Sequence, residues 1–317
     1  MKKQKKKSVS YYLKLQFFFV LTVAIGLIAA FSGITYYNQN LAKVNDSSLD
    51  GSEIVEEQQV TVPNDVAKAI IQEKLVGTSP YVLGAKSNVS VRVPILMYHY
   101  VEYVQDAGDK MRISLNTPPS VLENEIKTLA DAGYTFMTNK ELDDVLDGKA
   151  TLPKKPIVLT FDDGYRDFYT DAYPILKKYH VKATQYVISG FLDRPNHLLT
   201  NQLEEIAKDG LVEIGAHTVH HVWLKGGNAQ TVQGEVAQSR ATIEQLIHRP
   251  VTSFAYPFGA FDEQARQTVK IAGFRSATST IPGTEQKQEN RYFWYRLRPG
   301  GRTGQYLLNW LQEQTAS

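Results

Sequence analysis

Short apolar runs alternate with segments of helical periodicity from residue 91 to about residue 280. The apolar runs are rich in β-branched and aromatic residues, and they predict strands at 91–97, 134–137, 156–159, 181–188, 211–216, 253–256 and 274–278. Apolar residues at helical spacing predict helices at about 120–132, 142–146, 171–179, 199–208, 229–246 and 262–272. Strands and helices that alternate in this way are typical of a parallel sheet covered by helices.

The order of these elements also predicts the architecture. We expect an α/β fold in the form of a distorted, incomplete (β/α) barrel, and a doubly wound open sheet is the alternative. In a parallel barrel, functional side chains gather at the C-terminal ends of the strands. Ser120 and Glu123 have the spacing of a capping box and are expected to begin the helix at 120–132.

The first ninety residues have a different pattern. Five of the first seven residues are lysines, and the segment 17–37 contains no charge and is long enough to span a bilayer. The positive-inside rule then predicts a cytoplasmic tail at 1–16, a transmembrane signal anchor at 17–37, an extracytoplasmic stalk at 38–90 and the main domain at 91–317. A cleaved signal peptide or a buried core helix is the alternative for the anchor, and a small binding module is the alternative for the stalk.

Composition narrows the class of protein. The 317-residue chain is 43% hydrophobic and 21% charged, which is enough apolar material for one sizeable core. The net charge of +2, without a basic face in the main domain, argues against a nucleic-acid partner. Because there is no cysteine, thiolate metal sites, a cysteine nucleophile and disulfides are excluded. We expect a monomeric domain on the outside of a Gram-positive-like cell membrane, held there by its single anchor.

Two clusters of chemically active side chains directly follow predicted strands. Asp162 and Asp163 are followed by Gly164, which lets the chain turn so that both carboxylates can face one cleft. Two close carboxylates repel each other unless a cation lies beside them. His217 and His221 are spaced so that one helical turn or a tight loop presents both imidazoles on one side. Each cluster alone is more often a turn or a coincidence, but together they predict a three-ligand metal site with room for water.

Both clusters match known motifs. The segment 160–164 reads T-F-D-D-G, and the segment 217–221 reads H-T-V-H-H, which fits H-[ST]-x-x-H. In these motifs the chain resembles the polysaccharide deacetylases of carbohydrate esterase family 4, and the resemblance extends over about 91–308. It implies the distorted barrel, a catalytic base at Asp162, and a divalent metal whose ligands are Asp163, His217 and His221. Zinc suits such mixed nitrogen and oxygen ligands, and cobalt or nickel would also fit.

The chain departs from this family in its third motif, R-x-P-Y. That motif aligns with residues 255–258, so Ala255 stands where the family has the arginine that orients the base. Similar sequences occur in the branch that resembles poly-N-acetylglucosamine deacetylases. The backbone amide of Phe258 would still be the oxyanion donor, because a main-chain N–H does not depend on the side chain. Arg296 and Arg298 could replace the missing arginine, or they could belong to a solvated basic strand.

The family's general-acid histidine near the C-terminus is also absent, since no histidine follows His248. In the branch that resembles poly-N-acetylglucosamine deacetylases, the segment with this histidine looks circularly permuted to the start of the domain. The corresponding stretch here is 94–99, so the resemblance makes His99 the candidate acid. His220 competes with it, although a residue between two ligands on a turn is expected to point away.

The resemblance also implies a reaction and a substrate. The reaction is removal of N-acetyl groups, as acetate, from N-acetylglucosamine units of peptidoglycan or of an exported poly-N-acetylglucosamine. The alternatives are a glycan-binding protein that has lost turnover and another metal amidohydrolase. The presence of Asp162 argues against the glycan-binding protein, because a protein that only binds has no need of a base. The candidate substrate-binding side chains, each of which could equally be structural, are Tyr165, Trp223, Tyr256, Trp294 and Arg298.

Overall fold

The structure is a computed structural model of the chain, and it describes residues 90–316. The predicted signal anchor at 17–37 and the predicted stalk as far as residue 89 lie outside the described residues. Between residues 90 and 316, no helix is both long and apolar enough to cross a membrane. The predicted N-terminal organisation therefore remains a prediction.

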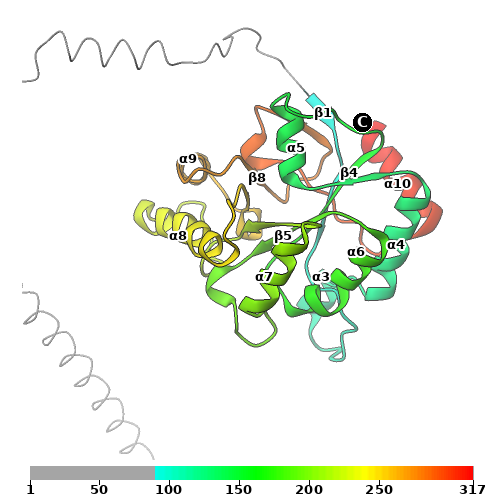
Figure 1. Ribbon diagram of the computed structural model, residues 1–317, viewed down its shortest axis with the longest axis horizontal. Helices are drawn as coiled ribbons and strands as arrows, with labels where there is room; N and C mark the ends of the chain where they lie inside the picture. The colour runs from blue at the N-terminus through cyan, green and yellow to red at the C-terminus, as the bar shows by residue number, and fades with distance from the viewer. Residues whose placement is uncertain (1–89, 317) are drawn as a thin grey trace, which may run out of the picture. The chain divides into compact units, whose positions relative to one another are not determined.

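Parallel strands form a sheet that curls around a central axis (Figure 1). The order along the sheet is β2-β4-β5-β6-β7-β8, with β3 paired beside β4. The strands are short, and most of their residues are buried. They are β2 (Ile95–Tyr98), β3 (Thr135–Met137), β4 (Pro156–Phe161), β5 (Ala183–Val187), β6 (Val212–Ala216), β7 (Ser253–Ala255) and β8 (Ser276–Thr278).

The segment 294–297 closes the curled sheet through isolated bridges to β8 on one side and β2 on the other. The N–H of Trp294 donates to the carbonyl of Ala277 at 2.8 Å, and the N–H of Leu297 donates to the carbonyl of Ile95 at 2.8 Å. The fold is therefore the predicted distorted barrel and not the doubly wound open sheet. Closure in this way places the side chain of Arg296 in the interior of the barrel, where it is buried.

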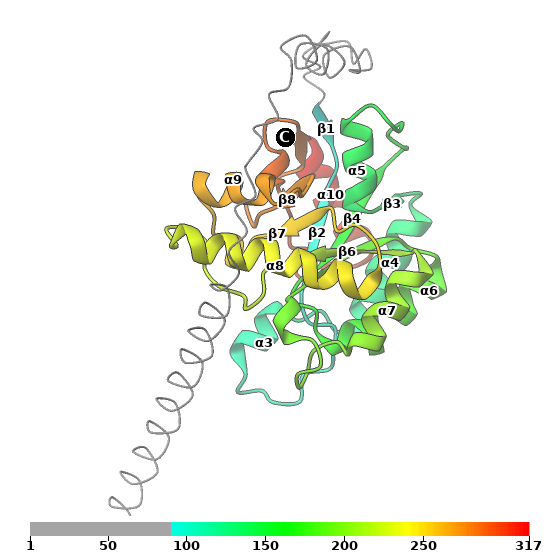
Figure 2. The ribbon, with the colours of Figure 1, turned by 60° about the vertical axis from the view of Figure 1, so that its left-hand side comes forward.

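Most of the helices cover the outer face of the sheet, and Figure 2 shows α8 lying along it. In α4, Leu122, Ile126 and Leu129 recur at helical spacing and are fully buried in the main core cluster together with Phe161 of β4. The helices are α3 (Lys110–Leu115), α4 (Pro119–Asp131), α5 (Asn139–Leu146), α6 (Tyr173–Tyr179), α7 (Thr200–Asp209), α8 (Ala229–Ile247), α9 (Glu263–Ile271) and α10 (Gly304–Ala316).

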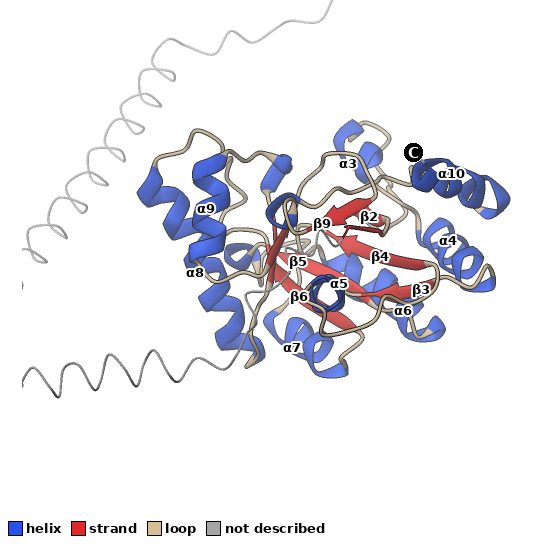
Figure 3. Ribbon diagram, turned by 90° about the horizontal axis from the view of Figure 1, so that it is seen from above, coloured by secondary structure: helices blue, strands red, loops and turns tan. Residues whose placement is uncertain are grey.

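Helix α5 packs against the inner side of the barrel, and Figure 3 shows it seen end-on, with α4, α6 and α7 on the outer side of the sheet. One side of α5 is apolar, since Leu142, Val145 and Leu146 belong to a second buried hydrophobic cluster that includes residues of β2, β3 and β4. Its other contacts with the strands are polar. The N–H of Asn139 donates to Oγ1 of Thr184 in β5 at 3.1 Å, and Oδ2 of Asp143 accepts from Oγ of Ser276 in β8 at 2.8 Å. Helix α5 thus fills the barrel at the N-terminal ends of these strands through apolar packing and hydrogen bonds, which leaves the C-terminal ends for the functional side chains.

Several local features differ from the sequence-based expectations. The capping box predicted at Ser120 is wrong, because α4 begins at Pro119 and has no side-chain cap. Helix α3 was not predicted, since it buries none of its residues and so has no apolar periodicity. Helix α10 and the antiparallel pair of β1 (Ser90–Arg92) with β9 (Glu285–Lys287) were also missed.

Candidate active site

Strands β4 and β6 bring the two predicted motifs to the same edge of the barrel. β4 ends at Phe161, directly before Asp162 and Asp163, and β6 ends at Ala216, directly before His217. β5 lies between these strands and is parallel to both, so their carboxyl ends point the same way. The predicted clusters, about fifty residues apart in the sequence, therefore meet in space.

The side chains of Asp163, His217 and His221 converge. One ligand atom from each lies within 4.8 Å of the others, and Oδ1 of Asp163 is 3.3 Å from Nε2 of His217 and 3.2 Å from Nε2 of His221. Nδ1 of His217 lies 2.7 Å from the carbonyl oxygen of Ala255. Because a carbonyl can only accept, Nδ1 carries a proton, and in the neutral ring Nε2 is free to offer a lone pair.

This set of donor atoms fits a divalent cation. Oδ1 of Asp163 is buried and has no hydrogen-bond partner. Burial raises the pKa of the Asp163 carboxyl, but His217 and His221 outweigh this effect and hold the pKa well below its usual range, so the group is a carboxylate. A carboxylate oxygen and two imidazole lone pairs this close together are stable only with a cation or a proton between them. One carboxylate and two histidines are also a ligand set that zinc uses.

The backbone around this cluster is strained. Nine non-glycine residues between 90 and 316 have a positive φ, and four of them are at the site: Asp163, Thr218, His221 and Phe258, with φ between 57° and 73°. For a β-branched residue such as Thr218 this conformation is especially unfavourable. Strain of this kind persists where the surrounding structure holds it and is concentrated at functional sites.

Glu235 of α8 holds the loop that presents the two histidines, and sequence patterns gave no signal for this role. Its Oε2 accepts from the backbone N–H groups of Val219 and His220, each at 2.9 Å. Its Oε1 lies 2.7 Å from Nδ1 of His220, whose side chain is 57% exposed. The competing acid candidate His220 is thus tied to Glu235 and points away from the converging side chains, as expected.

Arg296 pairs with Asp162 in a bidentate contact inside the barrel. Nη1 and Nη2 donate to the two carboxylate oxygens at 2.7 and 2.8 Å, and Nε donates to the carbonyl of Ser279 at 2.7 Å. Burial raises the pKa of the Asp162 carboxyl, but the charge and hydrogen bonds of Arg296 bring the pKa below its ordinary value. Of the two alternatives for Arg296, the structure therefore supports a partner of Asp162 and not a solvated strand.

His99 lies beside the same carboxylate. Its Nε2 is 3.9 Å from Oδ2 of Asp162. Burial lowers the pKa of the imidazole, and the nearby carboxylates offset this only in part, so the ring of the free protein is neutral at pH 7. His99 and Arg298 line a small cavity of about 50 Å³ together with Asn116, so Arg298 also lies at the site.

Two of the predicted sugar-stacking residues are in the wrong environment. Tyr256 and Trp294 are fully buried, so neither offers a ring face to a ligand, and the prediction for these two is wrong. Tyr165 is partly exposed and stacks on Tyr100 with 3.9 Å between ring centroids. Trp223 is 58% exposed, which leaves its ring accessible.

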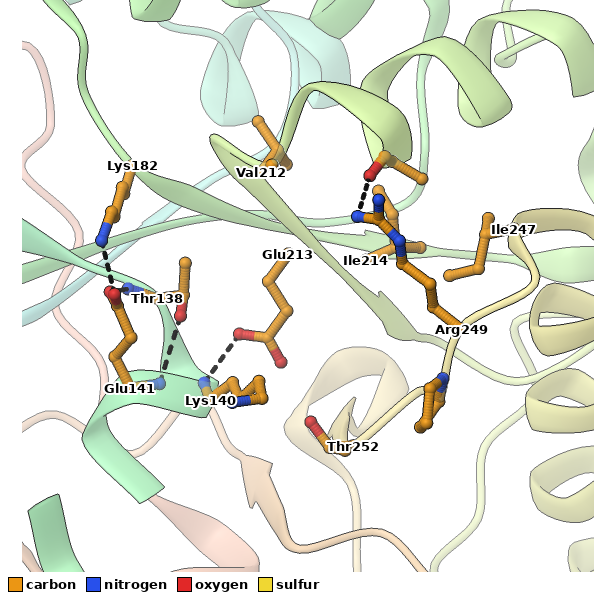
Figure 4. Close-up of a pocket in the computed structure, with 13 residues that line it drawn as sticks. Thr138, Lys140, Glu141, Lys182, Val212, Glu213, Ile214, Ile247, Arg249 and Thr252 are labelled. Atoms are coloured by element: carbon orange, nitrogen blue, oxygen red, sulfur yellow. Dashed lines mark hydrogen bonds and ion pairs between the residues drawn. The ribbon is translucent and has the colours of Figure 1, made fainter. Parts of the chain in front are cut away.

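A cavity of about 480 Å³ lies elsewhere, at the N-terminal ends of β5, β6 and β7 (Figure 4). In this close-up Lys182 points to Glu141, and Glu213 accepts from the backbone N–H of Lys140 at 2.7 Å. None of the residues of the two motifs lines it. The cavity therefore lies at the opposite end of the strands from the converging side chains.

A parallel barrel with a paired carboxylate and an Asp-His-His cluster at its strand ends is an arrangement typical of barrel hydrolases. A family model described as polysaccharide deacetylase matches residues 149–277. The Bacillus subtilis (strain 168) protein YxkH, described as a polysaccharide deacetylase, is 33% identical over 228 residues, which cover 72% of this chain and 77% of YxkH. The chain therefore belongs to the polysaccharide deacetylase family, as the two motifs indicated, and it is an enzyme of the polysaccharide N-deacetylase class.

Other relatives agree. The poly-beta-1,6-N-acetyl-D-glucosamine N-deacetylase of Staphylococcus aureus (strain MSSA476) is 27% identical over 191 residues, or 56% of this chain and 66% of that protein. Among solved structures, the Streptococcus pyogenes deacetylase PplD in complex with acetate is 28% identical, with a TM-score of 0.64 over 71% of this chain and 99% of PplD. A polysaccharide deacetylase from Bacillus cereus is 28% identical, with a TM-score of 0.62 over 70% of this chain and 69% of that one.

Proposed function

We propose that the chain hydrolyses the N-acetyl groups of N-acetylglucosamine units in a cell-surface polysaccharide and releases acetate. One observation carries this proposal: Asp162, paired with Arg296, lies directly beside the Asp163, His217 and His221 cluster. A protein that only binds glycans has no need of a buried carboxylate kept ionised next to such a cluster. The arrangement therefore favours turnover over the glycan-binding alternative.

Asp163, His217 and His221 would hold a divalent cation, for which zinc is our first choice. A cation there supplies Lewis-acid chemistry, since it withdraws electrons from the amide carbonyl and makes water more acidic. Asp162 is the general base and takes a proton from the attacking water. Arg296 keeps Asp162 ionised and fixes its two oxygens, so the base is oriented before the substrate arrives.

Two further groups complete the reaction. The backbone N–H of Phe258 donates to the oxyanion that develops as the carbonyl is attacked. His99 gives a proton to the leaving amine, which departs when the C–N bond breaks. Because burial lowers the pKa of His99, the ring must first take up a proton, and Asp162, which has just gained one, lies 3.9 Å away.

The glycan is either peptidoglycan or an exported poly-N-acetylglucosamine. The similarity to the Staphylococcus aureus poly-beta-1,6-N-acetyl-D-glucosamine N-deacetylase supports the second. We propose, from the lysines and the uncharged segment at 17–37, that a single membrane anchor holds the monomeric enzyme on the outside of the cell. Either polymer is accessible from that position.

The test is acetate release by the full-length protein after removal of metal and after addition of zinc or cobalt. The substrates are β-1,6-linked and β-1,4-linked N-acetylglucosamine oligomers and purified peptidoglycan. We expect metal-dependent release from one of these, and the preferred substrate identifies the glycan. No release from any of them by protein that has bound metal stoichiometrically would contradict the proposal and favour the glycan-binding alternative.

A further inference from the structure

Two large aromatic side chains lie exposed next to the candidate metal ligands. Trp223 is 58% exposed and Phe258 is 57% exposed, although residues of this kind normally bury most of their surface. Their ring centroids are 5.7 Å apart, and the planes differ by only 30°. Together they present one aromatic surface to solvent.

This surface begins at the site itself. The ring centroid of Phe258 is 4.5 Å from that of His221, which also contacts the ring of His217. The order outward from the cluster is therefore His221, then Phe258, then Trp223. A ligand that occupies the site and extends in this direction meets the aromatic surface.

The backbone of Phe258 has an energetically unfavourable conformation. Phe258 has φ 60° and ψ 5°, a left-handed conformation that is unfavourable for a bulky residue. Gly259 follows with φ 68°, and a Cβ there would lie 2.0 Å from Oγ1 of Thr280, so the turn is closely packed. A strained turn that exposes an apolar ring instead of burying it contributes nothing to the core, which indicates a role in binding.

The loop that carries Trp223 is also fixed. Leu224, the next residue, is fully buried. The N–H of Gly226 donates to Oδ2 of Asp262 at 2.7 Å, and Nε2 of Gln264 donates to the carbonyl of Gly227 at 3.1 Å. These contacts tie the loop to the first turn of α9. The backbone that carries Trp223 is therefore held before a ligand binds, which reduces the entropy lost on binding.

We propose that Trp223 and Phe258 form a sugar-binding subsite for the unit next to the one that is deacetylated. A pyranose ring has an apolar face of C–H groups, which packs on the electron-rich face of an aromatic ring. No charged group is needed for such a contact, which suits a neutral N-acetylglucosamine polymer. This inference rests on the proposed function, and it makes the enzyme selective for chains over single sugars.

The test compares Trp223→Ala and Trp223→Phe with the parent on an N-acetylglucosamine tetramer and on the monosaccharide. For Trp223→Ala we expect kcat/KM for the tetramer to fall about tenfold, mostly through KM, and to fall less for the monosaccharide, which cannot occupy both positions. Trp223→Phe keeps an aromatic face and should recover most of the loss. Tyr306→Ala is the matched control, because Tyr306 is 65% exposed on α10, and its tetramer KM should equal that of the parent.

Binding separates this proposal from the proposed function. Calorimetric titration of the full-length protein with the tetramer needs no turnover, and Trp223→Ala should bind about tenfold more weakly than the parent. An unchanged tetramer KM in Trp223→Ala, or equal tetramer binding by parent and variant, would overturn the subsite. If the parent releases no acetate but Trp223→Ala still binds the tetramer more weakly, the subsite stands while the proposed hydrolysis fails.

Discussion

Replacement of Arg296 by methionine tests whether this residue has taken over the role of the missing arginine. The variant keeps the length of the apolar stem but leaves the Asp162 carboxylate buried without its two hydrogen bonds at 2.7 and 2.8 Å. Both side chains are nearly inaccessible, at 1% and 3% exposure. Loss of one partner from a buried ion pair lowers the free energy of unfolding by about 3 to 5 kcal/mol.

Urea denaturation at neutral pH measures this loss, and acetate release measures the effect on the base. We expect kcat to fall at least about a hundredfold, because an unpaired buried Asp162 is protonated or misoriented. Arg275→Met is the matched control. Arg275 also contacts two carboxylates, Asp144 at 2.8 Å and Asp147 at 2.9 Å, but it is partly exposed, and it directly precedes β8, at the opposite end of the strand from the site.

The free energy of unfolding of Arg275→Met should fall by only about 1 kcal/mol, as is usual for surface ion pairs. The stability and kcat of Arg296→Lys should lie between those of the parent and of Arg296→Met, because one ammonium keeps the positive charge but cannot make the bidentate contact. Equal losses of stability in Arg296→Met and Arg275→Met, together with parental kcat in Arg296→Met, would refute the reasoning.

Three further predictions follow from other parts of the structure. Burial raises the pKa of Glu125 to about 8, well above its ordinary 4.5, so the contribution of Glu125 to stability is fully present below pH 4.5 and is lost as the pH rises through 8. This loss amounts to at most about 5 kcal/mol of the free energy of unfolding, and Glu125→Gln should abolish it. Urea denaturation of both proteins at acidic and alkaline pH measures the loss, and equal pH dependence in the two would count against the raised pKa. Glu235→Ala should weaken zinc binding about tenfold, measured by competition with a chelator, because the loop that carries the histidines is no longer held. Glu235→Gln should recover part of the lost affinity. Unchanged zinc affinity in Glu235→Ala would contradict the role of Glu235. Gly259→Ala should lower the free energy of unfolding by about 2 to 4 kcal/mol, because its Cβ would clash with Thr280 at positive φ, and a parental denaturation midpoint would show that the turn is not tightly packed.

The sequence predicted the strands and most helices well, because they are either apolar runs or strongly periodic. It could not predict how the barrel closes, since the segment 294–297 pairs through isolated bridges and has no strand pattern. It also missed α3, which buries nothing. Periodicity reports burial, so elements that bury little or pair irregularly leave no signal.

The sequence predicted those site residues that belong to recognisable motifs. It could not predict residues whose role depends only on where the fold places them. Asp162, Asp163, His217 and His221 converge because parallel strand ends share one edge. The partner of Asp162 comes from residue 296, which is 134 residues away, and only the fold brings them together. The sugar-stacking predictions failed for Tyr256 and Trp294, because aromatic residue type alone does not distinguish a core ring from an exposed one.

The most direct test of the account is a comparison of zinc-loaded parent protein with zinc-loaded Asp162→Asn on one N-acetylglucosamine oligomer, with acetate and new free amines counted together. We predict that the parent forms acetate and free amine in equal amounts, and that Asp162→Asn binds zinc as well as the parent does but forms neither. Equal product from the two zinc-loaded proteins would contradict Asp162 as the base. No product from zinc-loaded parent would contradict the proposed hydrolysis itself.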